Sequence, residues 1–263
     1  MSIVLITGDH PRHSHLAESL ARTGLVSGWI RELRESFEPE PPVHLSDDLK
    51  ALFRLHFRRR AEAEEAFFGS ADTIDAPMLS VAREELNSAK VMEFLNKSSP
   101  KLVLSYGCHK LSATTRDACD AVFWNTHGGL SPEYRGVITH FWPSYFLEPQ
   151  MTGMTLHETT DFLDGGGIVF QTAGSMVRGD GLHQLAARTV KEYSVQLSDR
   201  LSGLDLSDLP AGRTQTNSGR LFMSGDWRPE HLLNIYRHHE DRIVDQVLDG
   251  EITGRQPRLI SVI

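Results

Sequence analysis

Two short segments of this sequence combine residue types that could carry out acid–base chemistry. In the first, an amide and an imidazole stand two residues apart, at Asn125 and His127, directly after the apolar run of residues 121–124. Because alternate residues of an extended backbone point to the same side, both side chains can face one cleft. An amide N–H can stabilise negative charge that develops on an oxygen, and an imidazole can exchange protons.

The second segment carries carboxylates and a run of glycines. His157 and Glu158 end an apolar stretch, and a loop with Asp161 and Asp164 leads into the glycines at 165–167. Glycine lets the backbone approach a ligand closely, and such loops commonly carry function. Taken singly, each residue also has a structural explanation: His157 as a hydrogen-bonded core histidine, Asp161 as an exposed carboxylate, and Asp164 as a turn cap.

In this order the residues resemble the formyltransferase fold family, which includes glycinamide ribonucleotide, methionyl-tRNA and amino-sugar formyltransferases. The family pattern is Asn-x-His, then Leu-x-Pro-x-(Tyr/Trp)-Arg-Gly, then His-x-x-x-x-x-(Leu/Ile)-Asp-x-Gly. The matching residues are Asn125, His127, Pro132, Arg135, Gly136, His157, Leu163, Asp164 and Gly166. The sequence departs from the pattern at residues 129–131, Gly-Leu-Ser, where many members have Ser-Leu-Leu.

The resemblance implies a one-carbon transferase that moves a formyl group from 10-formyltetrahydrofolate to a primary amine, without a covalent enzyme intermediate. It implies that Asn125, His127 and Asp164 are catalytic. Asn125 and a protonated His127 would donate hydrogen bonds to the oxyanion of the tetrahedral intermediate. Asp164 would raise the pKa of His127 and relay protons through water.

The resemblance also implies where the two substrates bind. The folate would contact the turn after the strand expected over residues 102–106 and the loop before Asp164. These positions are Gly107, Cys108, His109, Lys110, Leu111, Thr160, Asp161, Phe162 and Leu163. Substrate contacts are expected from Arg12, after the first strand, and from Tyr134 and Arg135, although Arg135 could instead pin its own loop.

The histidines His10, His13 and His15 follow the first expected strand and raise the question of a metal. Metal sites need several convergent His, Cys, Asp or Glu ligands, and only Asp9 and Glu18 lie near this cluster in sequence. We therefore expect no metal.

The elements that must position these residues alternate between strand and helix. Apolar runs predict strands over residues 2–7, 25–30, 77–80, 102–106, 121–124, 152–158 and 168–172. Helical spacing predicts helices over residues 11–22, 84–96, 114–118, 137–147 and 183–201, and Ser46 is expected to cap a further long helix. The β-α-β start predicts an α/β fold with a Rossmann-like, mostly parallel sheet flanked by helices. Ligand sites of such sheets lie beyond the carboxyl ends of the strands, where Asn125 and His127 stand.

Residues 1–205 are the predicted catalytic domain, and residues 206–263 are a predicted small C-terminal appendage packed on it, with short helices over 229–236 and 241–248. Residues 35–45 contain three prolines and predict a loop. The long helix carries a basic cluster of Arg54, Arg58, Arg59 and Arg60. Because Glu62 and Glu64 follow Arg58 and Arg60 by four residues, a solvated face with paired charges is favoured over a phosphate-binding patch.

Composition limits the partners. The chain has 263 residues and a formal charge of −8, which argues against nucleic acid and against an anionic membrane as partners. Two cysteines cannot build a disulfide framework and favour a reducing compartment. No apolar run approaches the length of a membrane span, and the N-terminus lacks the features of a signal peptide. We expect a cytoplasmic enzyme, and a homodimer formed through the tail is plausible.

The sequence favours a small-molecule amine as the formyl acceptor. The acidic chain and its short tail argue against a tRNA acceptor, and the turn from Gly8 to Arg12 differs from the glycine-rich phosphate turn of glycinamide ribonucleotide formyltransferases. The Leu-Ser-Pro-x-Tyr-Arg-Gly form resembles enzymes of surface-polysaccharide amino sugars. A hydroxyornithine-type siderophore amine, glycinamide ribonucleotide and a folate-binding hydrolase of the same fold are the alternatives.

Overall fold

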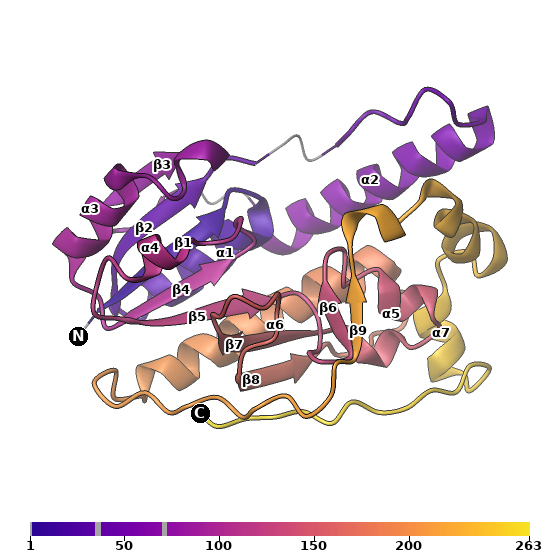
Figure 1. Cartoon of the computed structure of the whole chain (residues 1–263). Coiled ribbons are helices and arrows are strands. Elements are labelled where there is room, and N and C mark those ends of the chain that lie inside the picture. The colour runs from indigo at the N-terminus through magenta and orange to yellow at the C-terminus, as the bar shows by residue number, and fades with distance from the viewer. Residues whose placement is uncertain (1, 35–37, 70–72) are drawn as a thin grey trace.

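A seven-stranded sheet forms the centre of the molecule in a computed structural model that describes residues 2–34, 38–69 and 73–263 (Figure 1). Its strand order is β3-β2-β1-β4-β5-β7-β8. The first five strands pair in parallel, whereas β7 pairs antiparallel with both β5 and β8. The strands are β1 (Ile3–Gly8), β2 (Val26–Glu32), β3 (Met78–Val81), β4 (Leu102–Tyr106), β5 (Val122–His127), β7 (Gly153–Glu158) and β8 (Ile168–Ala173). The predicted Rossmann-like α/β fold is confirmed.

Helices cover both faces of this sheet. On one face, α1 (Pro11–Ala21) and α6 (Leu182–Ser202) pack on alternate strand residues such as Ile3 and Leu5. On the other face, α3 (Ala89–Ser98) packs on the intervening residues, among them Val4 and Ile6. This alternation is what a strand buried on both faces requires. No helix within the described ranges is long and apolar enough to cross a membrane.

The long helix α2 (Asp47–Phe68) packs against α1 and α6. It begins where the sequence predicts, because the Ser46 hydroxyl accepts a hydrogen bond from the Leu49 N–H and two aspartates occupy its first turn. The predicted loop over residues 35–45 has no regular structure from residue 38 onward, and residues 35–37 lie outside the described part.

The C-terminal segment after α6 lies along the rest of the molecule rather than apart from it. Arg213 and Ser261 form antiparallel bridges to Ile168 and Phe170 of β8, so the chain passes this edge of the sheet twice (Figure 1). Between these passes, β9 (Arg220–Phe222) pairs with β6 (Tyr134–Gly136), and α7 (Ile243–Leu248) follows. The division into a domain of residues 1–205 and an appendage of residues 206–263 stays a prediction.

Three predicted helices differ from the structure. In place of the helix predicted over residues 229–236, the chain forms a 3₁₀ turn, Pro229–His231, and a π-helical segment, Asn234–His238. The helix predicted over residues 137–147 is wrong for most of its length: only α5 (Trp142–Tyr145) forms, because Ile138 has a left-handed backbone and Pro143 favours a helix start over a helix interior. The helix predicted over residues 84–96 divides into a 3₁₀ turn, Arg83–Glu85, and α3. The extended backbone of Ser88 separates the two parts.

Part of the basic cluster on α2 is also more buried than its sequence spacing predicts. Arg58 and Glu62 form an exposed pair, as expected. The Glu64 side chain is only 8% exposed and contacts Arg60, and Arg59 reaches Asp241 of the tail at 2.7 Å. The expected pairing of Arg60 with Glu64 is present, but the prediction of a solvated face is wrong for this pair, because both residues line the cavity described below.

We expect Leu156→Ala to lower the free energy of unfolding by about 2–5 kcal/mol, because the side chain is fully buried between the sheet and α6. Denaturant unfolding followed by circular dichroism would measure this. Val195→Ala on the exposed face of α6 is the control and should change stability by less than about 0.5 kcal/mol. Equal effects of the two substitutions would contradict the assigned core.

Candidate active site

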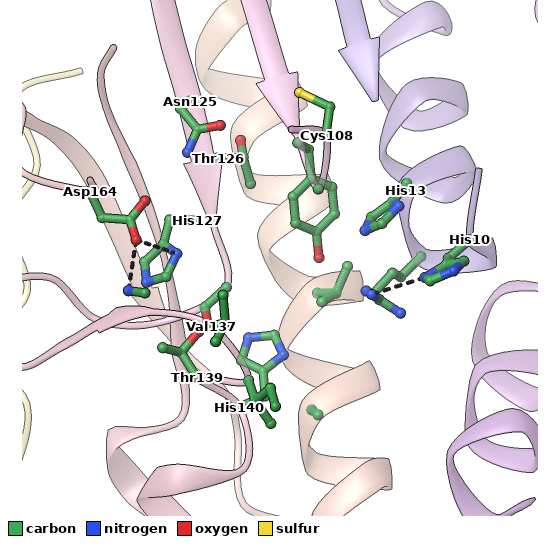
Figure 2. A pocket seen from close by; sticks show the side chains of 18 of the residues that line it. His10, His13, Cys108, Asn125, Thr126, His127, Val137, Thr139, His140 and Asp164 are labelled. Atoms are coloured by element: carbon green, nitrogen blue, oxygen red, sulfur yellow. Dashed lines mark hydrogen bonds and ion pairs between the residues drawn. The ribbon is translucent and has the colours of Figure 1, made fainter. Parts of the chain in front are cut away.

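A cavity of about 860 Å³ lies beyond the carboxyl ends of β1, β4 and β5. Its volume is in the usual range of ligand sites in proteins. It brings together most of the residues that the sequence predicts: Arg12, Gly107, Cys108, His109, Lys110, Leu111, Asn125, His127, Thr160, Asp161, Phe162, Leu163 and Asp164. Figure 2 shows Asn125, His127 and Asp164 on one side of this cavity and His10 and His13 on the other, with His140 between them.

The amide of Asn125 is held in one orientation by the strands on either side of it. The sheet register places Ser105 of β4 and His157 of β7 directly beside Asn125. The Ser105 hydroxyl donates to Asn125 Oδ1 at 2.8 Å, and Asn125 Nδ2 lies 3.2 Å from His157 Nε2. His157 Nδ1 is 2.8 Å from the carbonyl oxygen of Glu158 and donates to it, so Nε2 can accept. One N–H of Asn125 is thereby bound, and the other is available to a ligand.

Asp164 connects the two imidazoles of the site. Its Oδ2 accepts from the Gly136 N–H at 2.8 Å and lies 3.4 Å from His127 Nδ1, and its Oδ1 lies 3.4 Å from His157 Nε2. Burial would raise the pKa of this carboxyl, but His127, His157 and the Gly136 N–H together lower it to about 2. Asp164 is therefore ionised at neutral pH.

Gly166, two residues after Asp164, lies where two backbone segments approach each other closely. A Cβ at Gly166 would lie 1.9 Å from the carbonyl oxygen of Glu158, which no structure tolerates. Asp164 itself has a positive φ of 47°, a conformation that aspartate adopts more readily than most residues. The loop can therefore turn back sharply and present its carboxylate to His127.

Two opposing effects set the pKa of His127. Burial lowers it below 6.5, and Asp164 raises it, as expected, but by less than burial lowers it, so the expectation of a protonated His127 is wrong at neutral pH. His127 Nε2 lies 2.8 Å from the carbonyl oxygen of Tyr134 and donates to it, which leaves Nδ1 facing Asp164 without a proton. The resting pair is a neutral imidazole beside a carboxylate, ready to accept a proton at Nδ1.

Residues of the loops at 107–111 and 159–164 form a second wall of the cavity. Lys110 Nζ donates to the carbonyl oxygen of Asp161 at 3.0 Å and so joins the two loops. Phe162 and Leu163 are 79% and 50% exposed beside the cavity, although both are large and apolar. The buried hydroxyl of Thr159 has no hydrogen-bond partner within the described chain. Exposed apolar surface and an unpaired hydroxyl fit a flat, partly polar ring system such as that of a folate.

Glu32, a buried residue at the end of β2, binds the loop at 107–111 through His109. Its Oε2 accepts from the His109 N–H at 2.7 Å, and its other oxygen contacts the His109 ring. This role could not be predicted from the sequence, because Glu32 stands at the end of an apolar strand and matches no motif.

Tyr134 and Arg135 lie outside the cavity lining. The Tyr134 side chain is fully buried, and its hydroxyl donates to Glu148 at 2.6 Å. Arg135 contacts the carbonyl oxygen of Ser218 in the tail, which is the loop-pinning alternative rather than a substrate contact. The predicted roles of these two residues in substrate binding have no support in this geometry.

Several residues that line the cavity belong to no motif and are not among the predicted site residues. His140 Nε2 donates to the carbonyl oxygen of Gly153, and burial with the nearby charge of Arg12 lowers its pKa to about 4. His56 and His183 contact each other at 3.2 Å, and burial lowers the pKa of His56 to about 3. These imidazoles are neutral at physiological pH and offer hydrogen-bonding groups without charge. His56, His140 and His183 lie far apart in the sequence, and only the fold brings them to one cavity.

Residues 54–201, more than half of the chain, match the model of the formyl transferase family. The protein therefore belongs to the formyl transferase family and is an enzyme that transfers formyl groups. The formyl donor of this family is 10-formyltetrahydrofolate.

Solved structures share this fold. A phosphoribosylglycinamide formyltransferase from Anaplasma phagocytophilum is 19% identical, with a TM-score of 0.57 over 85% of this chain and 98% of that chain. A sugar N-formyltransferase from a Shewanella species is 18% identical, with a TM-score of 0.55 over 86% and 78%. An N-formyltransferase from Helicobacter canadensis, solved with folinic acid and dTDP-3-aminofucose, is 14% identical, with a TM-score of 0.52 over 93% and 81%. At these identities the likeness establishes the fold.

We expect Ser105→Ala to lower kcat by about tenfold, because Asn125 loses the hydrogen bond that fixes its amide. The KM for the folate donor should stay nearly unchanged, since Ser105 is only 4% exposed and is not among the expected folate contacts. Steady-state kinetics would measure both. Ser198→Ala, which removes a similar buried hydroxyl from α6, is the control and should retain full activity. A normal kcat in the Ser105 variant would show that this orientation is unimportant.

The pKa of His127 should lie below 6.5 and fall further in Asp164→Asn, because the carboxylate is what opposes the effect of burial. Activity should therefore fall as the pH drops through this pKa, because His127 becomes protonated and can no longer accept a proton. Titration of the histidine Cε1 resonances by NMR would give the values, with His127→Gln used to assign the peak. A His127 pKa above 6.5, or one that Asp164→Asn leaves unchanged, would contradict the proposed pairing.

Proposed function

We propose that this enzyme transfers the formyl group of 10-formyltetrahydrofolate to the primary amine of a small molecule, an amino sugar of the surface-polysaccharide type, with Asn125, His127 and Asp164 as its catalytic residues. The observation that carries the proposal is the fixed amide of Asn125. Its available N–H stands in the same cavity as a neutral imidazole that faces an ionised carboxylate.

The three side chains have distinct roles in this proposal. The bound folate supplies the formyl group as an electrophile. Asn125 Nδ2 donates to the formyl oxygen, and this hydrogen bond strengthens as that oxygen becomes an oxyanion. His127 accepts the proton that the attacking amine loses and holds it at Nδ1, where Asp164 stabilises the imidazolium. The same proton then passes to the nitrogen that leaves, so the enzyme returns to its initial state without a covalent intermediate.

The donor would bind between the loops at 107–111 and 159–164, with Gly107, Cys108, His109, Lys110, Leu111, Thr160, Asp161, Phe162 and Leu163 as its contacts. The acceptor would then occupy the opposite side of the cavity, next to Arg12 and His140. The lining there includes Phe57, Trp227 and the neutral pair His56 and His183. Aromatic rings and uncharged imidazoles suit the faces and hydroxyl groups of a sugar ring.

We also propose a compartment for the enzyme and a role for its C-terminal segment. Cys108 and Cys119 are free thiols, which suits the cytoplasm as the compartment. The tail reaches the cavity through Trp227 and covers the edge of the sheet at β8. We therefore assign residues 206–263 a structural role beside the catalytic unit, and a second copy of the chain could pack against the same surface.

Asn125→Ala should retain its fold and lose about 10²–10³ in kcat, because it lacks the oxyanion donor. The assay incubates the enzyme with 10-formyltetrahydrofolate and a panel of amines, and mass spectrometry detects a gain of one CO on the acceptor. The panel holds nucleotide-linked 3-amino and 4-amino sugars, hydroxyornithine and glycinamide ribonucleotide. Asn96→Ala, at an exposed asparagine on α3, is the matched control and should be fully active.

The outcomes of this assay distinguish the proposed function from its alternatives. Formylation of an amino sugar supports the proposal, and formylation of hydroxyornithine or glycinamide ribonucleotide instead would replace the acceptor. Loss of formyl from the folate with no amine modified would identify a hydrolase. Normal transfer by Asn125→Ala would contradict the catalytic assignment.

A further inference from the structure

A buried ionic cluster lies in the part of the cavity assigned to the acceptor. Glu64, from α2, is 8% exposed, and its Oε1 lies 2.6 Å from Arg12 Nη1 and 3.4 Å from Arg60 Nε. Its Oε2 accepts from the backbone N–H of Arg12 at 3.4 Å. All three residues line the cavity, and the two arginines are about one quarter exposed or less. Two guanidinium groups and a backbone N–H therefore converge on one carboxylate.

The backbone N–H in this cluster belongs to the first turn of α1. This helix has eleven residues, begins with Pro11, which has no N–H, and has no acidic residue in its first turn. The N-terminus of a helix favours an anion, and two arginines beside it make a strong position for a phosphate or a carboxylate. The protein supplies that anion itself. Burial would raise the pKa of Glu64, but Arg12 and Arg60 lower it overall, so the carboxylate is ionised.

A neighbouring side chain shows that this region also has unmet hydrogen-bonding capacity. His13, two residues inside α1, is 2% exposed and lines the same cavity. Its Nδ1 has no hydrogen-bond partner in the portion of the chain that the structure describes. The ring fits against Gly8 and Gly107, where a Cβ would come within 2.6 Å and 2.1 Å of ring nitrogens. Burial is the main cause that lowers its pKa well below 6.5, so His13 is neutral. A ligand that reaches this wall meets an uncharged imidazole next to a satisfied ion cluster.

We infer that Glu64 is a specificity-determining residue: its carboxylate occupies the position where an acceptor's phosphate would bind, so the enzyme rejects amines that carry a phosphomonoester at this end and accepts those that present hydroxyl groups. This inference rests on the proposed function, because it concerns the acceptor of the same reaction. A phosphate could reach Arg12 only beside the Glu64 carboxylate, and two like charges at hydrogen-bonding distances repel strongly in a partly buried site.

Glu64→Gln tests the inference, since it keeps the shape of the side chain and removes its charge. Binding of inorganic phosphate is measured by calorimetry at constant ionic strength, with chloride as the balancing anion. The wild-type protein should show no saturable binding in the millimolar range, and the variant should bind phosphate at least tenfold more tightly. Glu62→Gln, two residues away and on the exposed face of α2, is the matched control and should behave as wild type. The double variant Arg12→Met/Glu64→Gln should lose the acquired binding.

Glu64→Gln removes the carboxylate that contacts both Arg12 and Arg60, so the variant is expected to be less stable. Phosphate should then raise its melting temperature, or restore its folded circular dichroism spectrum if it is unfolded in chloride, because an anion that binds only the folded state stabilises it. A folded variant that gains no affinity for phosphate, or an unfolded one that phosphate does not restore, would overturn the inference. Equal phosphate affinity in the wild type and the variant would also overturn it.

A matched pair of amines extends the test to the acceptor itself. Glucosamine and glucosamine 6-phosphate differ only in the phosphomonoester. The wild type should bind the phosphorylated amine no better than glucosamine, and Glu64→Gln should reverse this order. Tight binding of glucosamine 6-phosphate to the wild type would contradict the inference. These measurements need no formyl transfer, so their failure is distinguishable from failure of the proposed reaction.

Discussion

A buried carboxylate that contacts two imidazoles holds the geometry of the proposed catalytic site together. Asp164 is only 7% exposed, and burial by itself favours the protonated form of a carboxyl group. His127, His157 and the Gly136 N–H reverse this preference, and they come from β5, β7 and β6. While it is buried, the carboxylate therefore depends on the register of these strands for the contacts that keep it ionised. That register also sets Ser105 and His157 beside Asn125, so the orientation of the oxyanion donor and the charge of Asp164 depend on the same packing.

The polar groups of the cavity are separated by charge. One wall places an ionised carboxylate against a neutral imidazole, where a proton can be accepted. The opposite wall holds two arginines and one carboxylate that satisfy each other. His140 stands between the walls and stays neutral, because burial and the charge of Arg12 both lower its pKa. Under the proposed function, this separation places proton exchange on one side of the cavity and selection of the acceptor by charge on the other.

Much of the fold and the candidate site could be predicted from local sequence, and the remainder could not, for physical reasons. Apolar runs predict β1, β4, β5, β7 and β8 because buried strands need them, and the Asn-x-His pair follows from the alternation of side chains along β5. Residues 137–147 looked helical because their apolar content is high, and a left-handed Ile138 cannot be read from that pattern. Glu64 and Arg60 have the spacing of an ordinary exposed pair. Only the packing of α2 against α1 and α6 places them in the cavity.

The most direct test of the central claim is a crystal structure of the enzyme with an unreactive formyl-folate analogue and the amine acceptor. We predict that the formyl oxygen lies within about 2.7–3.1 Å of Asn125 Nδ2, with the acceptor nitrogen on the side of Arg12 and His140 and within reach of the His127–Asp164 pair. A formyl group bound away from Asn125, with the folate ring outside the loops at 107–111 and 159–164, would contradict the account.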